Sequence, residues 1–176
     1  MASHRLASLA IAALLCGGAQ AAWSQAIYQA DGRWLDDKAQ SYKLEALHGT
    51  PTVLTMAYGA CRRVCSTSLR MLEALQGVAD QRHVALNFVV VGIDPGQDRP
   101  ADWADYRASR KLTRTNWQFL TGDEQSVLQM ANGLGVHYWR YGDHTLHDFK
   151  IVLLSPDGKL VRSIERADQD VTVLLP

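Results

Sequence analysis

A valine-rich run in the middle of the chain limits the fold more than any other feature of the sequence. The segment VALNFVVVGID, residues 84–94, is almost continuously apolar. Such a run is typical of a strand buried on both faces of a sheet, and both faces must then be covered by helices. A second apolar run, PTVLTMAY, predicts another buried strand from about Thr52 to Tyr58. The sequence therefore favours an α/β fold.

Helical periodicity and a hairpin pattern complete this fold prediction. Three helices are predicted, over about 62–79, 99–112 and 123–134. The segment 147–165, HDFKIVLLSPDGKLVRSIE, predicts a closing β-hairpin, because Pro-Asp-Gly supplies a turn between two apolar stretches. We expect a central mixed sheet, parallel in the middle and antiparallel at one edge, flanked by helices.

The first residues have the composition of a secretory signal peptide. Arg5 precedes an apolar stretch, and Ala19-Gln20-Ala21 offers a cleavage site before Ala22. The apolar stretch is about ten residues long, whereas a membrane-spanning helix needs roughly twenty. We therefore expect a signal peptide over residues 1–21 and one domain over residues 22–176, with a retained N-terminal anchor as the alternative.

Charge excludes one class of partner. The chain has 18 Lys and Arg against 18 Asp and Glu, so its formal net charge is zero. A chain without a basic field has no general electrostatic attraction for nucleic acid, which we exclude as a partner. The roughly 155 residues left after the predicted cleavage are enough for one domain with a substantial core, and we expect a monomer.

The cysteine usage points to a reactive pair. Cys16 lies in the predicted signal peptide, so the mature chain keeps only Cys61 and Cys65, in the segment CRRVC. A disulfide between them would close a loop so short that it removes little entropy from the unfolded chain. A purely structural role therefore explains the pair poorly, and a redox couple or a metal site is favoured.

The spacing of Cys61 and Cys65 suits both remaining roles. Residues four apart lie on one face of a helix, so both thiols can point the same way. The start of the predicted helix, together with Arg62 and Arg63, would lower both thiol pKa values. Two thiolates are soft ligands that suit Cu(I), and a neutral imidazole would complete a three-coordinate site acceptable to Cu(I) and Cu(II). Zinc is disfavoured because a structural zinc site needs four protein ligands.

Two histidines are candidates for that imidazole. His144 and His147 lie in GDHTLHDF, immediately before the predicted hairpin, where a side chain can be exposed yet rigidly held. Surface, loop or packing roles are expected for the remaining histidines of the mature chain, His48, His83 and His137. Asp94 and Asp98 are expected to order the loop after the buried strand, with a direct role in the site as the alternative.

Four segments, in order along the chain, together resemble the SCO/SenC family of thioredoxin-like copper-binding proteins. They are PTVLTMAYGACRRVC, VVVGIDPGQDRPADWADY, WQFLTGDEQSVLQMANGLGV and HDFKIVLLSPDGKL. In the last segment a histidine stands nine residues before Pro-Asp-Gly, as in the family, and this spacing selects His147. The resemblance implies a thioredoxin-like fold and copper ligands Cys61, Cys65 and His147, with His144 in reserve. Strand parity further predicts that His147 begins a regular strand that continues through Leu153.

The resemblance also implies a function. It is that of a periplasmic copper chaperone that binds one copper and assists assembly of the binuclear copper site of a terminal cytochrome oxidase. The implied partners are a client copper protein such as an oxidase subunit, and an upstream copper donor or thiol reductant. Arg62 and Ser66 stand where the family commonly has proline.

Two other functions remain open. One is a thiol–disulfide oxidoreductase that reduces the cysteines of a client copper protein, with Cys61 attacking and Cys65 resolving. The other is a binding domain with an inert disulfide.

Overall fold

The computed structural model describes residues 27–29, 32–59 and 65–176, without the side chains of Cys65 and Ser66. The predicted signal peptide, residues 1–21, lies outside the described residues. The predicted start of the first helix near Arg62 also lies outside them. Among the described residues, none of the helices combines the length and the apolar composition that crossing a membrane requires.

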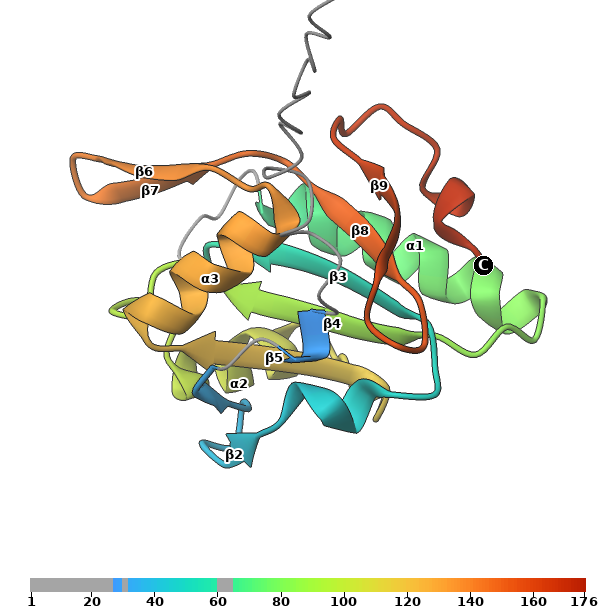
Figure 1. The fold of residues 1–176 in the computed structure, drawn as a ribbon, viewed down its shortest axis with the longest axis horizontal. Helices are drawn as coiled ribbons and strands as arrows, with labels where there is room; N and C mark the ends of the chain where they lie inside the picture. The colour runs from blue at the N-terminus through green and yellow to red at the C-terminus, as the bar shows by residue number, and fades with distance from the viewer. Residues whose placement is uncertain (1–26, 30–31, 60–64) are drawn as a thin grey trace, which may run out of the picture.

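A seven-stranded mixed sheet forms the centre of the molecule (Figure 1). Its order is β2-β1-β5-β4-β3-β8-β9. The strands are β1 (Trp34–Leu35), β2 (Ser41–Tyr42), β3 (Thr52–Ala57), β4 (Asn87–Gly92), β5 (Trp117–Gly122), β8 (Ile151–Leu154) and β9 (Leu160–Ile164). The three central strands β5, β4 and β3 run parallel, and the strands at both edges are antiparallel.

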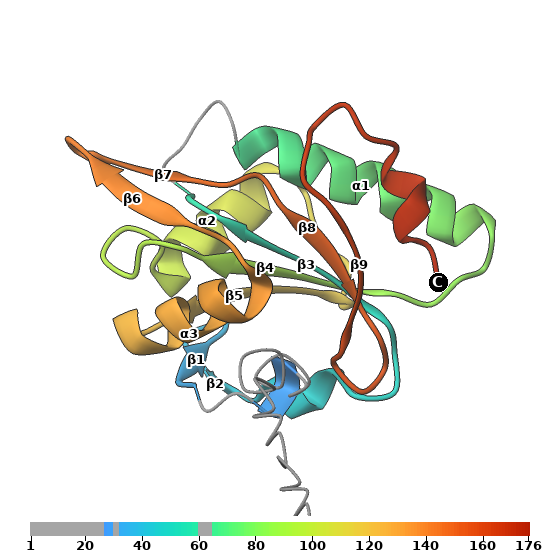
Figure 2. The same cartoon turned by 45° about the horizontal axis from the view of Figure 1, so that its top comes forward.

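Helices cover both faces of this sheet, as the apolar runs require. Every residue of β3 is buried, and in β4 only Asn87 is partly exposed. The helices are α1 (Cys65–Gln81), α2 (Pro100–Ser109) and α3 (Glu124–Leu134), with short 3-10 helices η2 (Ile27–Gln29), η3 (Leu44–Leu47) and η4 (Val171–Leu174). The crossovers β3-α1-β4 and β4-α2-β5 step in the same direction across the sheet, so right-handed connections put α1 and α2 on one face. The chain then steps back past β3 to β8, and α3 covers the opposite face (Figures 1 and 2).

Local chemistry sets the ends of these elements. Pro100 is the first residue of α2. Asp123 caps α3 by accepting a hydrogen bond from the backbone N–H of Ser126, and Gly135 ends that helix with a left-handed φ of 63°. The turn of the closing hairpin contains Gly158 at a φ of 82°. The fold class, the buried strands and the closing hairpin are confirmed.

One predicted strand is wrong. His147 does not begin the strand that contains Leu153, because β8 starts only at Ile151. His147 instead ends β7 (His144–His147), which pairs with β6 (Tyr138–Tyr141) in a separate two-stranded sheet. A two-residue turn with Gly142 at a φ of 59° joins the two strands, so local pairing replaces the long regular strand. This β6–β7 hairpin stands out from the body of the protein (Figures 1 and 2).

Candidate metal centre

The cysteine segment leaves the sheet at the carboxyl end of β3. β3 ends at Ala57, and α1 as described begins at Cys65. In the sequence Cys61 falls between these two elements, and Cys65 is the first described residue of α1. Cys61 itself lies outside the described residues, and so does the thiol of Cys65. Among the side chains that are described, no group of three or more His, Cys, Asp or Glu is arranged to hold a metal ion.

His147 lies at the same end of the sheet. β8 runs antiparallel to β3, and their last paired residues are Thr55 and Ile151. The hydroxyl of Thr55 also donates a hydrogen bond to the carbonyl oxygen of Lys150, at 2.8 Å. In the chain, His147 comes before Ile151 and Cys61 comes after Thr55. Because β3 and β8 run antiparallel, both segments continue from the same end of this strand pair. The structure thus places the predicted histidine segment at the end of the sheet where β3 ends.

The two candidate histidines lie on opposite faces of the β6–β7 hairpin. His144 pairs with Tyr141 and is exposed, whereas His147 pairs with Tyr138 and is partly buried. Alternate residues of a strand point to opposite faces, so His147 shares its face with Thr145. Thr145 is turned toward the loop that follows β4, because its hydroxyl donates a hydrogen bond to Asp94 at 2.9 Å. The hairpin geometry therefore favours His147 over His144.

A carbonyl oxygen orients the imidazole of His147. Nδ1 of His147 lies 2.8 Å from the backbone oxygen of Asp148. A carbonyl oxygen can only accept, so Nδ1 carries the proton in this contact. The lone pair of the neutral ring is then on Nε2, the nitrogen that would bind a metal. A bond to the other ring nitrogen is the usual way in which proteins fix a metal-binding histidine.

The side chain of Asp148 closes the base of the hairpin. One carboxylate oxygen accepts a hydrogen bond from the backbone N–H of His137 at 3.0 Å and lies 2.7 Å from Nδ1 of that residue. The backbone N–H of His137, and then its imidazole, lower the pKa of Asp148. The imidazole of His137 is exposed, in keeping with the surface role predicted for it. Asp148 thus anchors the hairpin directly beside His147.

Two aspartates order the loop that follows β4, as predicted. The carboxylate of Asp98 is fully buried and accepts three backbone hydrogen bonds, from Gly59 at 2.7 Å and from Ile93 and Asp94 at 2.8 Å. Burial raises the pKa of Asp98 to about 6. Asp94 accepts hydrogen bonds from Thr145 and, at 3.3 Å, from Arg140. This loop therefore contacts both the end of β3 and the β6–β7 hairpin.

Sequence reasoning missed the residues that hold the hairpin in place. Thr145 and Arg140 bind an aspartate some 50 positions away, and only the fold brings them together. The hairpin itself did have a signal. Gly142-Asp143 is a turn sequence, and it separates two short stretches rich in residues that favour strands.

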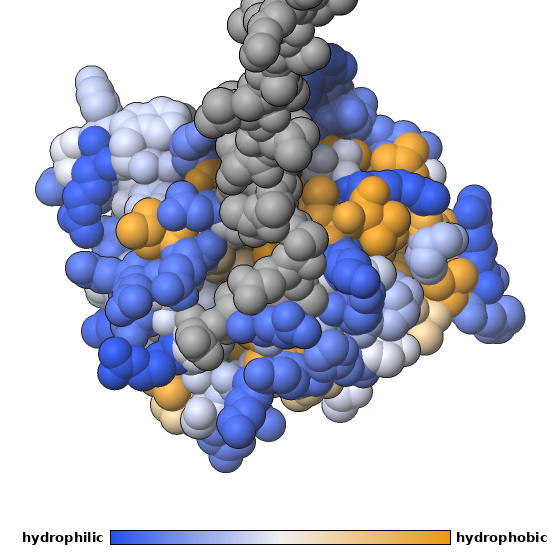
Figure 3. All heavy atoms as spheres, in the orientation of Figure 1, coloured by the Kyte–Doolittle hydropathy of each residue, from blue (hydrophilic) through white to orange (hydrophobic). Residues whose placement is uncertain are grey.

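The outward face of the hairpin is apolar and exposed. Trp139 and Leu146 form a cross-strand pair there, and Tyr141 lies on the same face. Their exposed fractions are 51%, 42% and 72%, respectively. The hairpin is the pale projection at the upper left of Figure 3.

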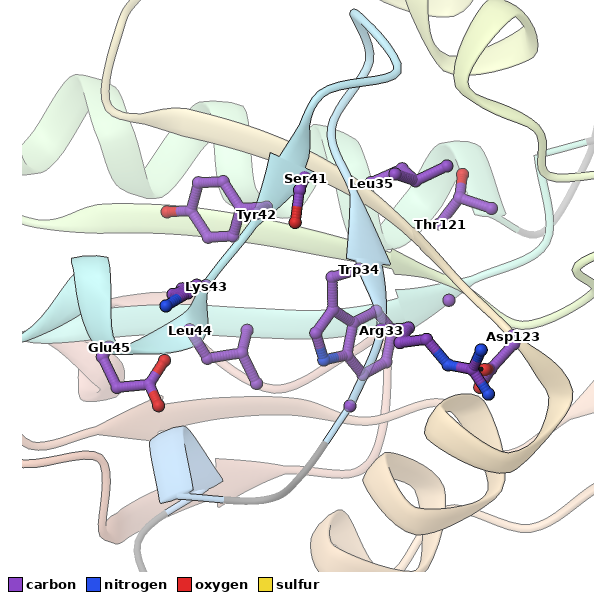
Figure 4. Close-up of a pocket in the computed structure, with 12 residues that line it drawn as sticks. Arg33, Trp34, Leu35, Ser41, Tyr42, Lys43, Leu44, Glu45, Thr121 and Asp123 are labelled. Atoms are coloured by element: carbon purple, nitrogen blue, oxygen red, sulfur yellow. Dashed lines mark ion pairs between the residues drawn. The ribbon is translucent and has the colours of Figure 1, made fainter.

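A groove of about 650 Å³ lies elsewhere, beside β1, β2 and the end of β5 (Figure 4). Trp34 lines it, and an ion pair of 2.9 Å between Arg33 and Asp123 lies at its side. The indole ring fills the space that side chains at Gly32 and Gly122 would need. Of the predicted metal ligands whose side chains are described, neither His147 nor His144 lines this groove.

Comparison with known proteins places this fold and its motifs in one family. The sequence profile described as SCO1/SenC matches residues 23–174. A SCO1 protein homolog of Bacillus subtilis (strain 168) is 24% identical over 127 residues, which cover 70% of this chain and 66% of the homolog. This chain thus spans just under two thirds of the length of that relative.

Solved structures share the fold. ScoI of Arabidopsis thaliana with copper bound superposes with a TM-score of 0.71 at 22% identity, over 82% of this chain and 91% of that one. Yeast Sco1 with copper bound has a TM-score of 0.68 at 18% identity, over 81% and 82% of the two chains. These likenesses confirm the thioredoxin-like architecture. The family profile spans all but two of the residues from 23 to the last, Pro176, and includes every motif quoted above, so the chain belongs to the SCO1/SenC family.

Proposed function

We propose that this protein is an extracytoplasmic copper chaperone that assists assembly of the binuclear copper site of a terminal cytochrome oxidase. Membership of the SCO1/SenC family supports a copper-binding role in oxidase assembly. The copper-bound structures of Arabidopsis ScoI and yeast Sco1 support copper as the cargo. BsSco, another solved relative, is described as a member of the Sco family of cytochrome c oxidase assembly proteins. The client of this chain is accordingly an oxidase subunit or a similar copper protein.

The copper would bind to Cys61, Cys65 and His147. The observation that carries this assignment is the position of His147, which precedes β8 at the end of the sheet where β3 ends and has Nδ1 held by a carbonyl oxygen. Two thiolates and one imidazole form a donor set that suits copper in both oxidation states. The positive charges of Arg62 and Arg63 would also lower the thiol pKa values and so favour the thiolate forms that bind the metal.

The predicted signal peptide over residues 1–21 fits a protein that works outside the cytoplasm. A solved relative from Bacillus anthracis is described as a SCO1/SenC family lipoprotein, which supports an extracytoplasmic location. We propose that the mature domain begins at Ala22 and acts in the periplasm, with a retained N-terminal anchor as the alternative.

Copper titration of the reduced protein tests the ligand assignment. We expect one copper per chain, and we expect His147→Ala to weaken the affinity by more than about 100-fold, beyond the usual cost of losing a residue that only supports a ligand. His144→Ala is the matched control, because it removes an imidazole from the opposite face of the same hairpin. Equal affinities in the wild type and His147→Ala would overturn the assignment. A loss confined to His144→Ala would move it to the reserve ligand.

Thiol–disulfide exchange is a second candidate function. Cys65 is the first described residue of α1, and a thiol at a helix start has its pKa lowered by the helix dipole. The disulfide switch that is named for BsSco supports redox chemistry in a relative. The thiolate of Cys61 would attack a client disulfide and form a mixed disulfide, and Cys65 would then displace the reduced client. The products are a client dithiol and a Cys61–Cys65 disulfide, which an upstream thiol reductant resets.

Trapping separates this second candidate from copper delivery alone. In Cys65→Ser the resolving thiol is missing, so a mixed disulfide between Cys61 and the client should accumulate. Non-reducing electrophoresis of envelope extracts would show it as a species of higher mass that disappears with reductant. Cys61→Ser is the control and should trap nothing. No mixed disulfide in Cys65→Ser would remove the main support for reductase activity.

A further inference from the structure

We propose that Thr145 and Asp94 are positioning residues for His147. The hydrogen bond between them, which we call the clasp, fixes the β6–β7 hairpin to the loop after β4. It thereby holds His147 at the end of the sheet where β3 ends. The inference rests on the proposed function, because it concerns the same copper site. It adds Thr145 to that site and gives Asp94 a positioning role in place of the direct role that the sequence left open.

The hairpin has almost no core of its own. Of the four residues in each of its strands, Thr145 alone is buried. An isolated two-stranded hairpin is marginally stable in water, so its position depends on what anchors it to the body. A hollow of about 360 Å³ lies between the hairpin, α3 and the loop after β4, so close apolar packing does not fill that side. Tyr138 packs against the core at the base of the hairpin, so the rest of the hairpin depends on polar contacts.

One carboxylate oxygen contacts both strands of the hairpin, and the hydroxyl of Tyr58 also donates to the carbonyl oxygen of Asp143 in the turn, at 3.5 Å. Oδ2 of Asp94 accepts a hydrogen bond from Thr145 at 2.9 Å and from Arg140 at 3.3 Å. Arg140 and Thr145 are directly opposite each other in the two strands, so one oxygen holds both strands at the same rung. Asp94 is only 4% exposed, and its other oxygen accepts from the backbone N–H of Gly96 at 3.1 Å. A buried, charged acceptor of this kind makes the stronger class of hydrogen bond.

The clasp acts on His147 through the strand. Thr145 and His147 are two residues apart in β7, so their side chains leave the same face of the hairpin. On the other side of His147, Asp148 is tied to His137. His147 therefore lies between two anchored residues, one on each side. Releasing Thr145 would remove the anchored residue on the β7 side of His147 and leave the position of the imidazole less well defined.

The same loop also holds the segment that leads to the cysteines. Asp98 lies four residues after Asp94 in this loop. Its carboxylate accepts a hydrogen bond from the backbone N–H of Gly59, which precedes Cys61 by two residues. Backbone bonds from residues 97 and 98 to the carbonyl oxygen of Asp94 fix the loop in between. The loop thus ties the histidine segment and the cysteine segment to one frame. Metal ligands need such a frame, because a site that is loose by about 1 Å loses much of its function.

The test replaces Thr145 with valine, which keeps the shape and removes the hydroxyl. In the copper-free protein, we expect faster amide hydrogen exchange over residues 138–147, because the hairpin is released. In the copper-loaded protein, we expect dissociation into a chelator to accelerate about 10–100-fold, the usual cost of losing a residue that supports a metal ligand. The absorption band from thiolate to Cu(II) should also change, and Thr145→Ser should restore all three properties.

Thr52→Val is the matched control. Thr52 is a fully buried threonine on β3 whose hydroxyl accepts a hydrogen bond from Tyr28 at 2.7 Å. It lies at the amino end of its strand, away from the site, so its loss should lower stability and leave copper dissociation, the thiolate band and hairpin exchange unchanged. This control separates a positioning role from general destabilisation.

The outcomes distinguish the clasp from the proposed function. Unchanged hairpin exchange, copper dissociation and spectrum in Thr145→Val would overturn the clasp and leave copper binding intact. Equal changes in Thr145→Val and Thr52→Val would overturn it as well, because the effect would then be general destabilisation. A wild-type protein that takes no copper would overturn the proposed function together with the positioning role.

Discussion

The buried carboxylate of Asp98 should make the stability of this protein depend on pH in an unusual direction. The other described carboxylates whose pKa is shifted, such as Asp148 and Asp157, have lowered values because they accept hydrogen bonds or pair with cations. In Asp98, burial outweighs three backbone hydrogen bonds and raises the pKa from 3.8 to about 6. The folded protein therefore binds a proton at Asp98 more readily than the unfolded chain does.

The sign and size of the effect follow from that shift. Between the unfolded pKa of 3.8 and the folded pKa of about 6, the folded state holds more protons, so the contribution to stability falls as pH rises through this window. Below the window the contribution is complete, and above pH 6 it is lost. A shift of this size corresponds to about 3 kcal/mol in total. From pH 7 to pH 5, the free energy of unfolding should gain about 1 kcal/mol from Asp98.

Urea unfolding of the wild type and Asp98→Asn measures this contribution. The copper-free, reduced proteins would be compared at pH 5, 6 and 7. Asparagine does not titrate, and all other groups are shared, so the difference between the two proteins isolates Asp98. The variant should be less stable throughout by about 1–3 kcal/mol, because one backbone N–H loses its acceptor. The difference should widen by about 1 kcal/mol at pH 5. A difference that stays flat, or narrows, would show that the three hydrogen bonds outweigh burial.

Two further predictions concern packing and buried polar groups. Gly122→Ala would place a methyl group 2.5 Å from the ring of Trp34 and should cost about 1–3 kcal/mol in urea unfolding. Gly77→Ala is the control, because Gly77 is on the exposed side of α1 with nothing within 4 Å, and this change should stabilise the protein by about 0.5–1 kcal/mol. A Gly122→Ala variant as stable as the wild type would show that Trp34 has room to move. Gln76→Leu removes the acceptor of the Trp117 indole, now 3.1 Å away, and should lower the free energy of unfolding by about 1–3 kcal/mol. No loss there would mean that the indole finds another acceptor.

The central fold could be predicted because its signals are local. The run over residues 84–94 had to be buried on both faces, and the crossover rule then fixes which face each helix covers. Helix ends at Pro100 and Gly135 follow from residue chemistry alone. These features do not depend on partners far away in the sequence.

The surroundings of the candidate site could be predicted only in part. The motifs selected His147, and the hairpin faces favour it, but its position as the last residue of β7 was missed. The hairpin has no apolar periodicity of its own, and the contact between Thr145 and Asp94 joins residues 51 positions apart. Such contacts depend on how the whole chain folds. The thiols of Cys61 and Cys65 stay predictions, because their arrangement lies outside the described residues.

X-ray absorption at the copper edge of the loaded protein would identify the ligands of the proposed copper site. We expect a copper with two sulfur ligands and one histidine nitrogen. The nitrogen signal should be lost in His147→Ala and kept in His144→Ala, while both sulfur ligands should remain in each variant. A spectrum without sulfur ligands, or a histidine signal that survives in His147→Ala, would contradict the proposed copper site.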